Sequence, residues 1–152
     1  MRLQTRCLIG CGIVLLLSAV QVDAAGDLRI IQAVRRGDTQ AVRALLKQKV
    51  DVNATQADGA TALHWAVYQD DLTTADVLLR AGAKVNVVNE LGATPLYLAC
   101  ENGSTLMVGR LLQAGASPNA ALPSGETALM TAARAGSVGA VRALLVKGAD
   151  IN

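Results

Sequence analysis

The residues of this chain that could carry catalytic chemistry are few, and their spacing matches no known catalytic arrangement. His64 is the only histidine, and a lone histidine makes no zinc site without other ligands at the required spacing. A Ser-His-Asp set with Asp58, Asp70 or Asp71 is formally possible, but no serine stands in a G-x-S-x-G elbow. The glycines form no phosphate-binding loop. The sequence therefore predicts no catalytic residues, no metal and no cofactor.

The dominant feature of the chain is a period of 33 residues. Glycine, threonine, asparagine and paired leucines recur at fixed positions, as in Gly59, Gly92 and Gly125; Thr61, Thr94 and Thr127; Asn53, Asn86, Asn119 and Asn152; and Leu78-Leu79 and Leu111-Leu112. Such a period indicates a repeat array, in which each unit buries its apolar face only against its neighbours. Cys100 occupies the position of Val67 and Ala133, which predicts a buried core residue rather than a reactive thiol.

Each unit has the same predicted elements. A turn at Asp58-Gly59 precedes Thr61, which can cap the short helix that follows. A second helix with apolar residues at three- and four-residue spacing ends at Gly82-Ala83, since glycine tolerates a left-handed helix end. An extended stretch, 85–88, then leads to the next turn. The pattern predicts two helices and a projecting hairpin per unit.

These residues resemble the ankyrin repeat family. The segments Thr61-Ala-Leu-His-Trp-Ala66, Thr94-Pro-Leu-Tyr-Leu-Ala99 and Thr127-Ala-Leu-Met-Thr-Ala132 match its T-P-L-H-x-A signature. Leu78-Leu-Arg-Ala-Gly-Ala-Lys-Val-Asn86 matches its later motif. The resemblance implies an all-α solenoid of paired antiparallel helices with β-hairpin-like loops. It spans residues 25–152, as about four repeats at 27–55, 56–88, 89–121 and 122–152.

The resemblance also implies where a partner would bind and what His64 does. His64 resembles the family histidine that links the hairpin to the helix start. Partner contacts are expected from hairpin tips and from the end of each first helix. By position in the repeat, the candidates are Arg35, Tyr68, Gln69, Asp58, Glu90, Leu91, Glu101, Asn102, Ser124, Glu126 and Arg134. Tyr68 is the foremost of these, because tyrosine is enriched at interface hot spots. Trp65 is expected to pack between layers, with contact to a partner as the alternative.

The first 24 residues have the layout of a secretory signal peptide. Arg2 and Arg6 precede an apolar run over 7–20, and small residues before position 25 suit cleavage after Ala24. An uncleaved anchor is the alternative, although 14 residues fall short of the roughly 20 that span a bilayer. Leu8-Ile9-Gly10-Cys11 resembles a lipoprotein motif, but most of the apolar stretch follows the cysteine. The sequence predicts an exported, periplasmic or secreted protein.

Charge argues against nucleic acid and membrane surfaces as partners. The chain has 14 basic and 12 acidic residues, and removing Arg2, Arg6 and Asp23 with the leader leaves 12 and 11. This balance gives no excess of basic residues of the kind that binds nucleic acid.

The two ends of the array differ. The first unit lacks the Gly-Thr turn and carries Arg29, Arg35, Arg36 and Arg43, as an N-terminal cap would. The last unit keeps an internal pattern at Val138, Val141, Leu144, Leu145 and Ile151. Either a longer array continues beyond Asn152, which we favour, or the last face pairs with another molecule. We expect aggregation through Val141, Leu144 and Leu145.

The function expected from these patterns is non-enzymatic binding of a protein partner outside the cytoplasm. Two other classes remain open: a structural spacer within a longer multi-repeat or multidomain protein, and a binding segment attached to a catalytic domain.

Overall fold

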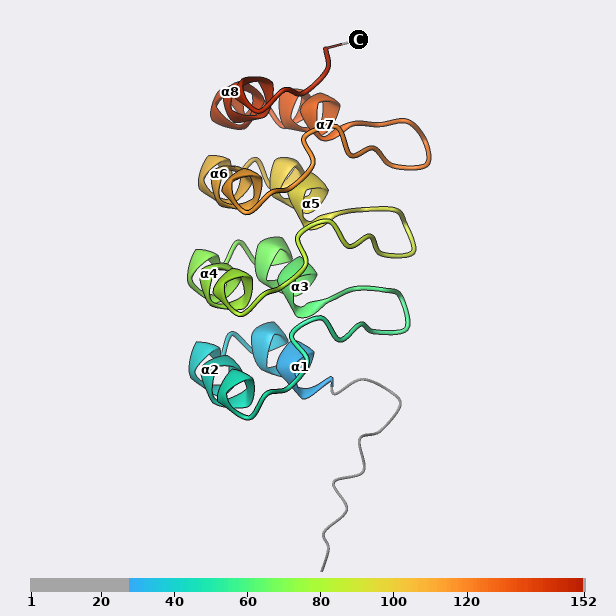
Figure 1. Cartoon of the computed structure of the whole chain (residues 1–152). Helices are drawn as coiled ribbons and strands as arrows, with labels where there is room; N and C mark the ends of the chain where they lie inside the picture. The colour runs from blue at the N-terminus through green and yellow to red at the C-terminus, as the bar shows by residue number, and fades with distance from the viewer. Residues whose placement is uncertain (1–27, 152) are drawn as a thin grey trace, which may run out of the picture.

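Four pairs of helices stack as layers, with a loop projecting from each of three junctions (Figure 1). The computed structural model describes residues 28–151, so the expected signal peptide and Asn152 lie outside it. The helices are α1 (Arg29–Arg35), α2 (Thr39–Lys47), α3 (Ala62–Tyr68), α4 (Leu72–Arg80), α5 (Pro95–Glu101), α6 (Thr105–Gln113), α7 (Ala128–Arg134) and α8 (Val138–Val146). The predicted all-α repeat solenoid is confirmed. No helix within 28–151 is long and apolar enough to cross a membrane.

The repeating threonines begin the short helices as predicted. The side chains of Thr61, Thr94 and Thr127 each accept a hydrogen bond from the backbone N–H three residues later. These bonds satisfy donors that have no partner within the helix. The first helix differs, because Leu28 at its start makes no side-chain cap bond.

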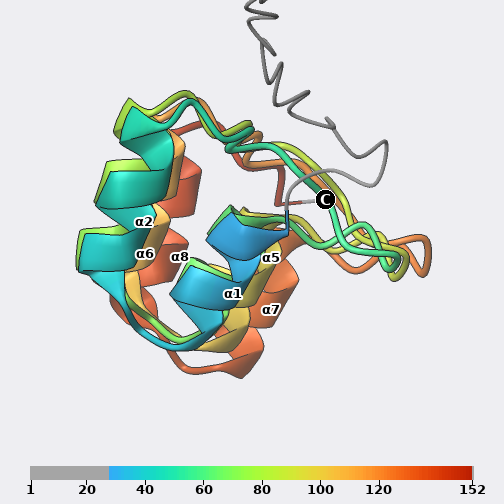
Figure 2. The ribbon, with the colours of Figure 1, turned by 90° about the horizontal axis from the view of Figure 1, so that it is seen from below.

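The helices form two layers, which Figure 2 shows from below the stack. The short helices α1, α3, α5 and α7 pack on one another in series, and α2, α4, α6 and α8 form the outer layer. Small and aliphatic side chains fill the core, among them Leu63, Leu78, Leu96 and Leu111. We call the surface formed by the hairpins (54–61, 87–94 and 120–127) and the adjoining parts of α1, α3, α5 and α7 the inner surface.

The repeating asparagines join each unit to the next. Asn86 Nδ2 donates to Gly115 O at 3.1 Å, and its Oδ1 accepts from Ser117 N at 2.9 Å. Asn53 and Asn119 make the same two bonds to the following unit. One amide thus satisfies an acceptor and a donor beyond the end of the next outer helix.

Two helices end at a left-handed residue that is not glycine. Glycine at these two positions is expected to stabilise the fold. Lys49 and Asp70 have positive φ angles of 61° and 53°, where the equivalent positions carry Gly82 and Gly103. The left-handed conformation costs non-glycine residues about 1 kcal/mol or more. We expect Lys49→Gly and Asp70→Gly each to raise the free energy of unfolding by about 0.5–1 kcal/mol in urea denaturation. The reverse change, Gly115→Ala at φ 91°, should lower it.

The last layer corrects part of the sequence prediction. Leu144 is 0% exposed and Val141 is partly buried, because both point back into the stack. The exposed large apolar side chains of this layer are Met130, Val138, Leu145, Val146 and Ile151. Positions buried in the third unit, such as Cys100 and Leu112, become exposed at Ala133 and Leu145 in the fourth. The uncovered apolar face exists, but Leu144 is no part of it.

Candidate functional site

A pocket of about 230 Å³ lies on the inner surface where the second unit meets the third. Its walls come from the hairpin before α3, from α3 itself and from the following unit. The lining residues are Asp58, Ala60, His64, Trp65, Tyr68, Asn89 and Leu98. Two of them, Asp58 and Tyr68, belong to the predicted contact surface.

The aromatic wall of the pocket is held in place by hydrogen bonding and stacking. Trp65 Nε1 donates to Gln56 Oε1 at 2.6 Å, which fixes the indole against the hairpin. The Tyr68 ring meets it edge-on, with centroids 5.9 Å apart and an interplanar angle of 81°. The Arg35 guanidinium lies 4.6 Å from the Trp65 ring centroid, within cation–π range.

Trp65 packs against the core as expected, but it also has a second environment at the surface. Trp65 touches the core but is only partly buried, and it lines the pocket. Its position in the repeat, shared with Gln32, Leu98 and Thr131, gave no sign of this. The pocket arises from residues one unit apart in sequence, so single-unit patterns could not reveal it.

His64 forms the floor of the pocket and links two units. Thr61 N donates to its Nδ1 at 3.2 Å, and its Nε2 lies 3.1 Å from Ala93 O. A carbonyl only accepts, so Nε2 carries the hydrogen and Nδ1 is the acceptor. Burial lowers the pKa of His64, and the Ala93 bond and the charge of Asp58 offset this only in part. The link expected from the resemblance is present, and the ring is a neutral structural group.

The predicted contact residues separate into three groups on the inner surface. Asp58 and Tyr68 line the pocket, Tyr68 is 63% exposed, and Arg35 lies over the Trp65 ring. Glu90 and Leu91 are exposed at the next hairpin tip, with Leu91 76% exposed, and Glu101 is exposed at the end of α5. The group in the fourth unit comprises Ser124, Glu126 and Arg134, where Arg134 Nη1 and Glu126 Oε1 form an ion pair at 2.6 Å.

Gln69 and Asn102 have an intramolecular role that the sequence pattern did not predict. Gln69 Nε2 donates to Arg35 O at 3.0 Å, and Asn102 Nδ2 donates to Val67 O at 2.9 Å. Each amide therefore caps the C-terminal end of the short helix in the preceding unit. Contact of these two side chains with a partner stays a prediction.

Cys100 is expected to be unreactive in the folded protein. The thiol is fully buried, and burial raises its pKa to about 12, so thiolate is scarce near neutral pH. Native protein should react with a disulfide reagent at Cys100 only after denaturant is added. Fast reaction in buffer would contradict the buried placement.

Within residues 28–151, no group of three or more His, Cys, Asp or Glu side chains is arranged to hold a metal ion.

Comparison with protein families places this fold in a known group. A family model described as ankyrin repeats (3 copies) matches residues 7–89 and again residues 70–152, which together cover most of the chain. A search of curated proteins found no match.

Proposed function

Since the chain belongs to the ankyrin repeat family, we propose that it is a non-enzymatic module that binds a protein partner through the inner surface. Ankyrin repeats typically mediate protein–protein binding, and the family is typically non-enzymatic. The scaffold does not specify the partner, because one fold serves many targets. The partner is therefore recognised by side chains that differ between units.

The observation that supports the inner surface is the pocket beside Tyr68. Tyrosine and tryptophan offer large contact areas with few rotatable bonds, and hot spots concentrate in such pockets. Trp65 and Tyr68 are the only aromatic residues of the second unit, and both line this pocket. The exposed tip residue Leu91 adds an apolar contact on the adjacent hairpin.

Affinity capture with matched variants tests the surface. The full chain, tagged at its C-terminus, is compared with the Tyr68→Ala, Arg134→Ala double variant. The control is Leu106→Ala, which removes a 69% exposed apolar side chain from outer helix α6. Captured proteins should be retained by the control and reduced about tenfold or more by the double variant. If every captured protein binds the double variant as well as the parent chain, the surface is assigned wrongly.

The proposed site of action is outside the cytoplasm, after removal of residues 1–24. The basic start, the apolar run over 7–20 and the small residues before position 25 support export. Cleavage would also remove Cys7 and Cys11, leaving one of the three thiols. Cell fractionation with a thiol count on denatured protein tests this: one thiol in the exported fraction is expected, and three would indicate a retained leader.

A structural role is the second candidate, and the apolar end of the array favours it. Leu145 and Ile151 are exposed on the last layer, whereas the equivalent Leu112 is buried and the equivalent Pro118 is half-buried in the third unit. A further repeat stacked on this layer would bury them. In this role the array would space or support other domains. Substitutions on the inner surface would then leave that structural role unchanged.

A further inference from the structure

The aromatic pair at the pocket is confined to one unit. The positions equivalent to Trp65 carry Gln32, Leu98 and Thr131, and those equivalent to Tyr68 carry Arg35, Glu101 and Arg134. Aromatic faces attract cations through their quadrupole, and Arg35 already occupies such a position over Trp65 at 4.6 Å. The indole is thus placed where a positive group is stabilised.

The same pocket contains a carboxylate without a cationic partner. Asp58 is exposed, and its Oδ1 accepts a turn hydrogen bond from Ala60 N at 3.0 Å. Its other oxygen accepts no hydrogen bond from residues 28–151, and no ion pair there includes Asp58. The only titratable neighbour on the pocket wall that could balance it is His64, which is neutral and already bonded to Ala93 O.

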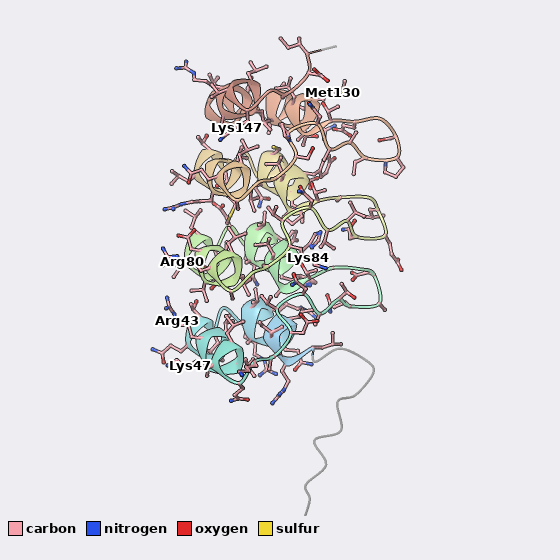
Figure 3. All side chains as sticks on the ribbon, in the orientation of Figure 1. Arg43, Lys47, Arg80, Lys84, Met130 and Lys147 are labelled. Carbon is pink, nitrogen blue, oxygen red and sulfur yellow. The ribbon has the colours of Figure 1, made fainter. Side chains whose placement is uncertain are left out.

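The charged side chains of the hairpins have the same sign as Asp58. The three hairpins carry Asp58, Glu90 and Glu126 and no lysine or arginine. The four outer helices instead carry Arg43, Lys47, Arg80, Arg110 and Arg142 against one acid, Asp76. Figure 3 shows Arg43, Lys47 and Arg80 on the outer-helix side, away from the projecting loops. A side chain that enters the pocket therefore meets acids on the two nearest hairpins, Asp58 and Glu90, whereas Glu126 is paired with Arg134.

We propose that the pocket between Asp58, Trp65 and Tyr68 receives a basic side chain, arginine or lysine, from the protein partner. The aliphatic stem lies along Trp65 and Leu98, and the charged end reaches the free oxygen of Asp58. Asn89 is uncharged, and its Oδ1 holds the hairpin by accepting from Leu91 N and Ala93 N. This inference rests on the proposed function and adds the chemistry of the partner.

Arg35 makes the sign of the occupant testable. Its guanidinium lies over Trp65, one of the lining residues, so it repels a basic occupant and would attract an acidic one. Asp58 does the opposite. Neutralising each residue in turn therefore shifts affinity in opposite directions, and the directions reverse if the occupant is an anion.

Tryptophan fluorescence gives a direct readout, because Trp65 is the only tryptophan of the chain. The probes are capped Gly-Ser-Arg-Ser-Gly and the same peptide with lysine, norleucine or glutamate at its centre. Arginine and lysine peptides should change the emission saturably, and the glutamate peptide should not. Asp58→Asn should weaken the arginine peptide about tenfold, as expected for loss of a charged hydrogen bond. Arg35→Gln should strengthen it.

The control for charge alone is Asp150→Asn, which removes one negative charge at the far end of the array. It should change the affinity by less than about twofold. Asp58→Asn keeps the turn, because an amide oxygen can still accept from Ala60 N. Equal binding of arginine and norleucine peptides, or tighter binding of glutamate, would overturn the inference.

The captured partner separates this inference from the proposed function. If Tyr68→Ala abolishes capture and Asp58→Asn leaves it unchanged, the inner surface is correct and the basic occupant is wrong. If neither substitution affects capture, both are wrong. Loss of capture with both, together with the peptide result, supports the basic occupant.

Discussion

Replacing Leu144 by alanine is expected to lower the free energy of unfolding by about 2–4 kcal/mol, whereas Leu145→Ala should lower it by less than about 1 kcal/mol. The two residues are neighbours in the same helix and lose the same atoms. Leu144 is 0% exposed and Leu145 is 41% exposed. Urea denaturation followed by circular dichroism measures both.

The difference arises from which side of α8 each residue occupies. Leu144 packs inside the stack, as Leu111 and Leu78 do at the same position of the two preceding units. Removing it leaves a cavity between α8 and the helices against which it packs, α6 and α7. Hydrogen exchange should consequently increase first in α7 and α8.

Solubility should respond in the reverse order. Leu145→Lys and Val146→Lys are expected to raise solubility, because they remove exposed apolar surface from the last layer. Leu144→Lys should unfold that layer instead. Equal destabilisation by Leu144→Ala and Leu145→Ala would show that the placement of α8 is wrong. A parent chain that stays monomeric at high concentration would remove the support for a stacking role.

The scaffold could be predicted because each repeating residue satisfies a local requirement of the backbone, such as capping a helix or ending it. Threonine at the helix start and glycine after the helix end depend only on local geometry, so Thr61 and Gly82 were identified correctly. The burial of Cys100 followed from the apolar residues at its equivalent positions. These local requirements recur in every unit, so the residues that meet them recur in the sequence every 33 positions.

The pocket could not be predicted in the same way, because it is built between units. Trp65 acquires its environment from Arg35 in the first unit, Gln56 in its own unit and Leu98 in the third. The helix-capping amides of Gln69 and Asn102 likewise reach one unit back. Leu144 was misjudged for a related reason, since apolar pattern alone does not tell which side of a terminal helix remains uncovered.

The second large effect is expected at His64. His64→Ala should lower the free energy of unfolding by about 2–3 kcal/mol, because it leaves buried hydrogen-bonding groups of Thr61 and Ala93 without partners. The loss concerns the junction of the second and third units. Thermal unfolding of this variant and of the parent chain, at a pH where His64 is neutral, measures it.

His64 should also make the free energy of unfolding depend on pH. The pKa of folded His64 lies below its ordinary value of about 6.5, so the unfolded chain binds more protons in the window between the two values. Stability is therefore complete above about pH 6.5 and falls as the pH decreases through that window, before most carboxylates titrate. His64→Met, with the residue found at the equivalent position Met130, keeps the apolar volume and removes the titration. Because His64 is the only histidine, the parent chain should lose stability as the pH falls below about 6.5, whereas the His64→Met variant should not show this loss. Identical pH profiles for the two proteins would mean that His64 is not held in its neutral form by the fold.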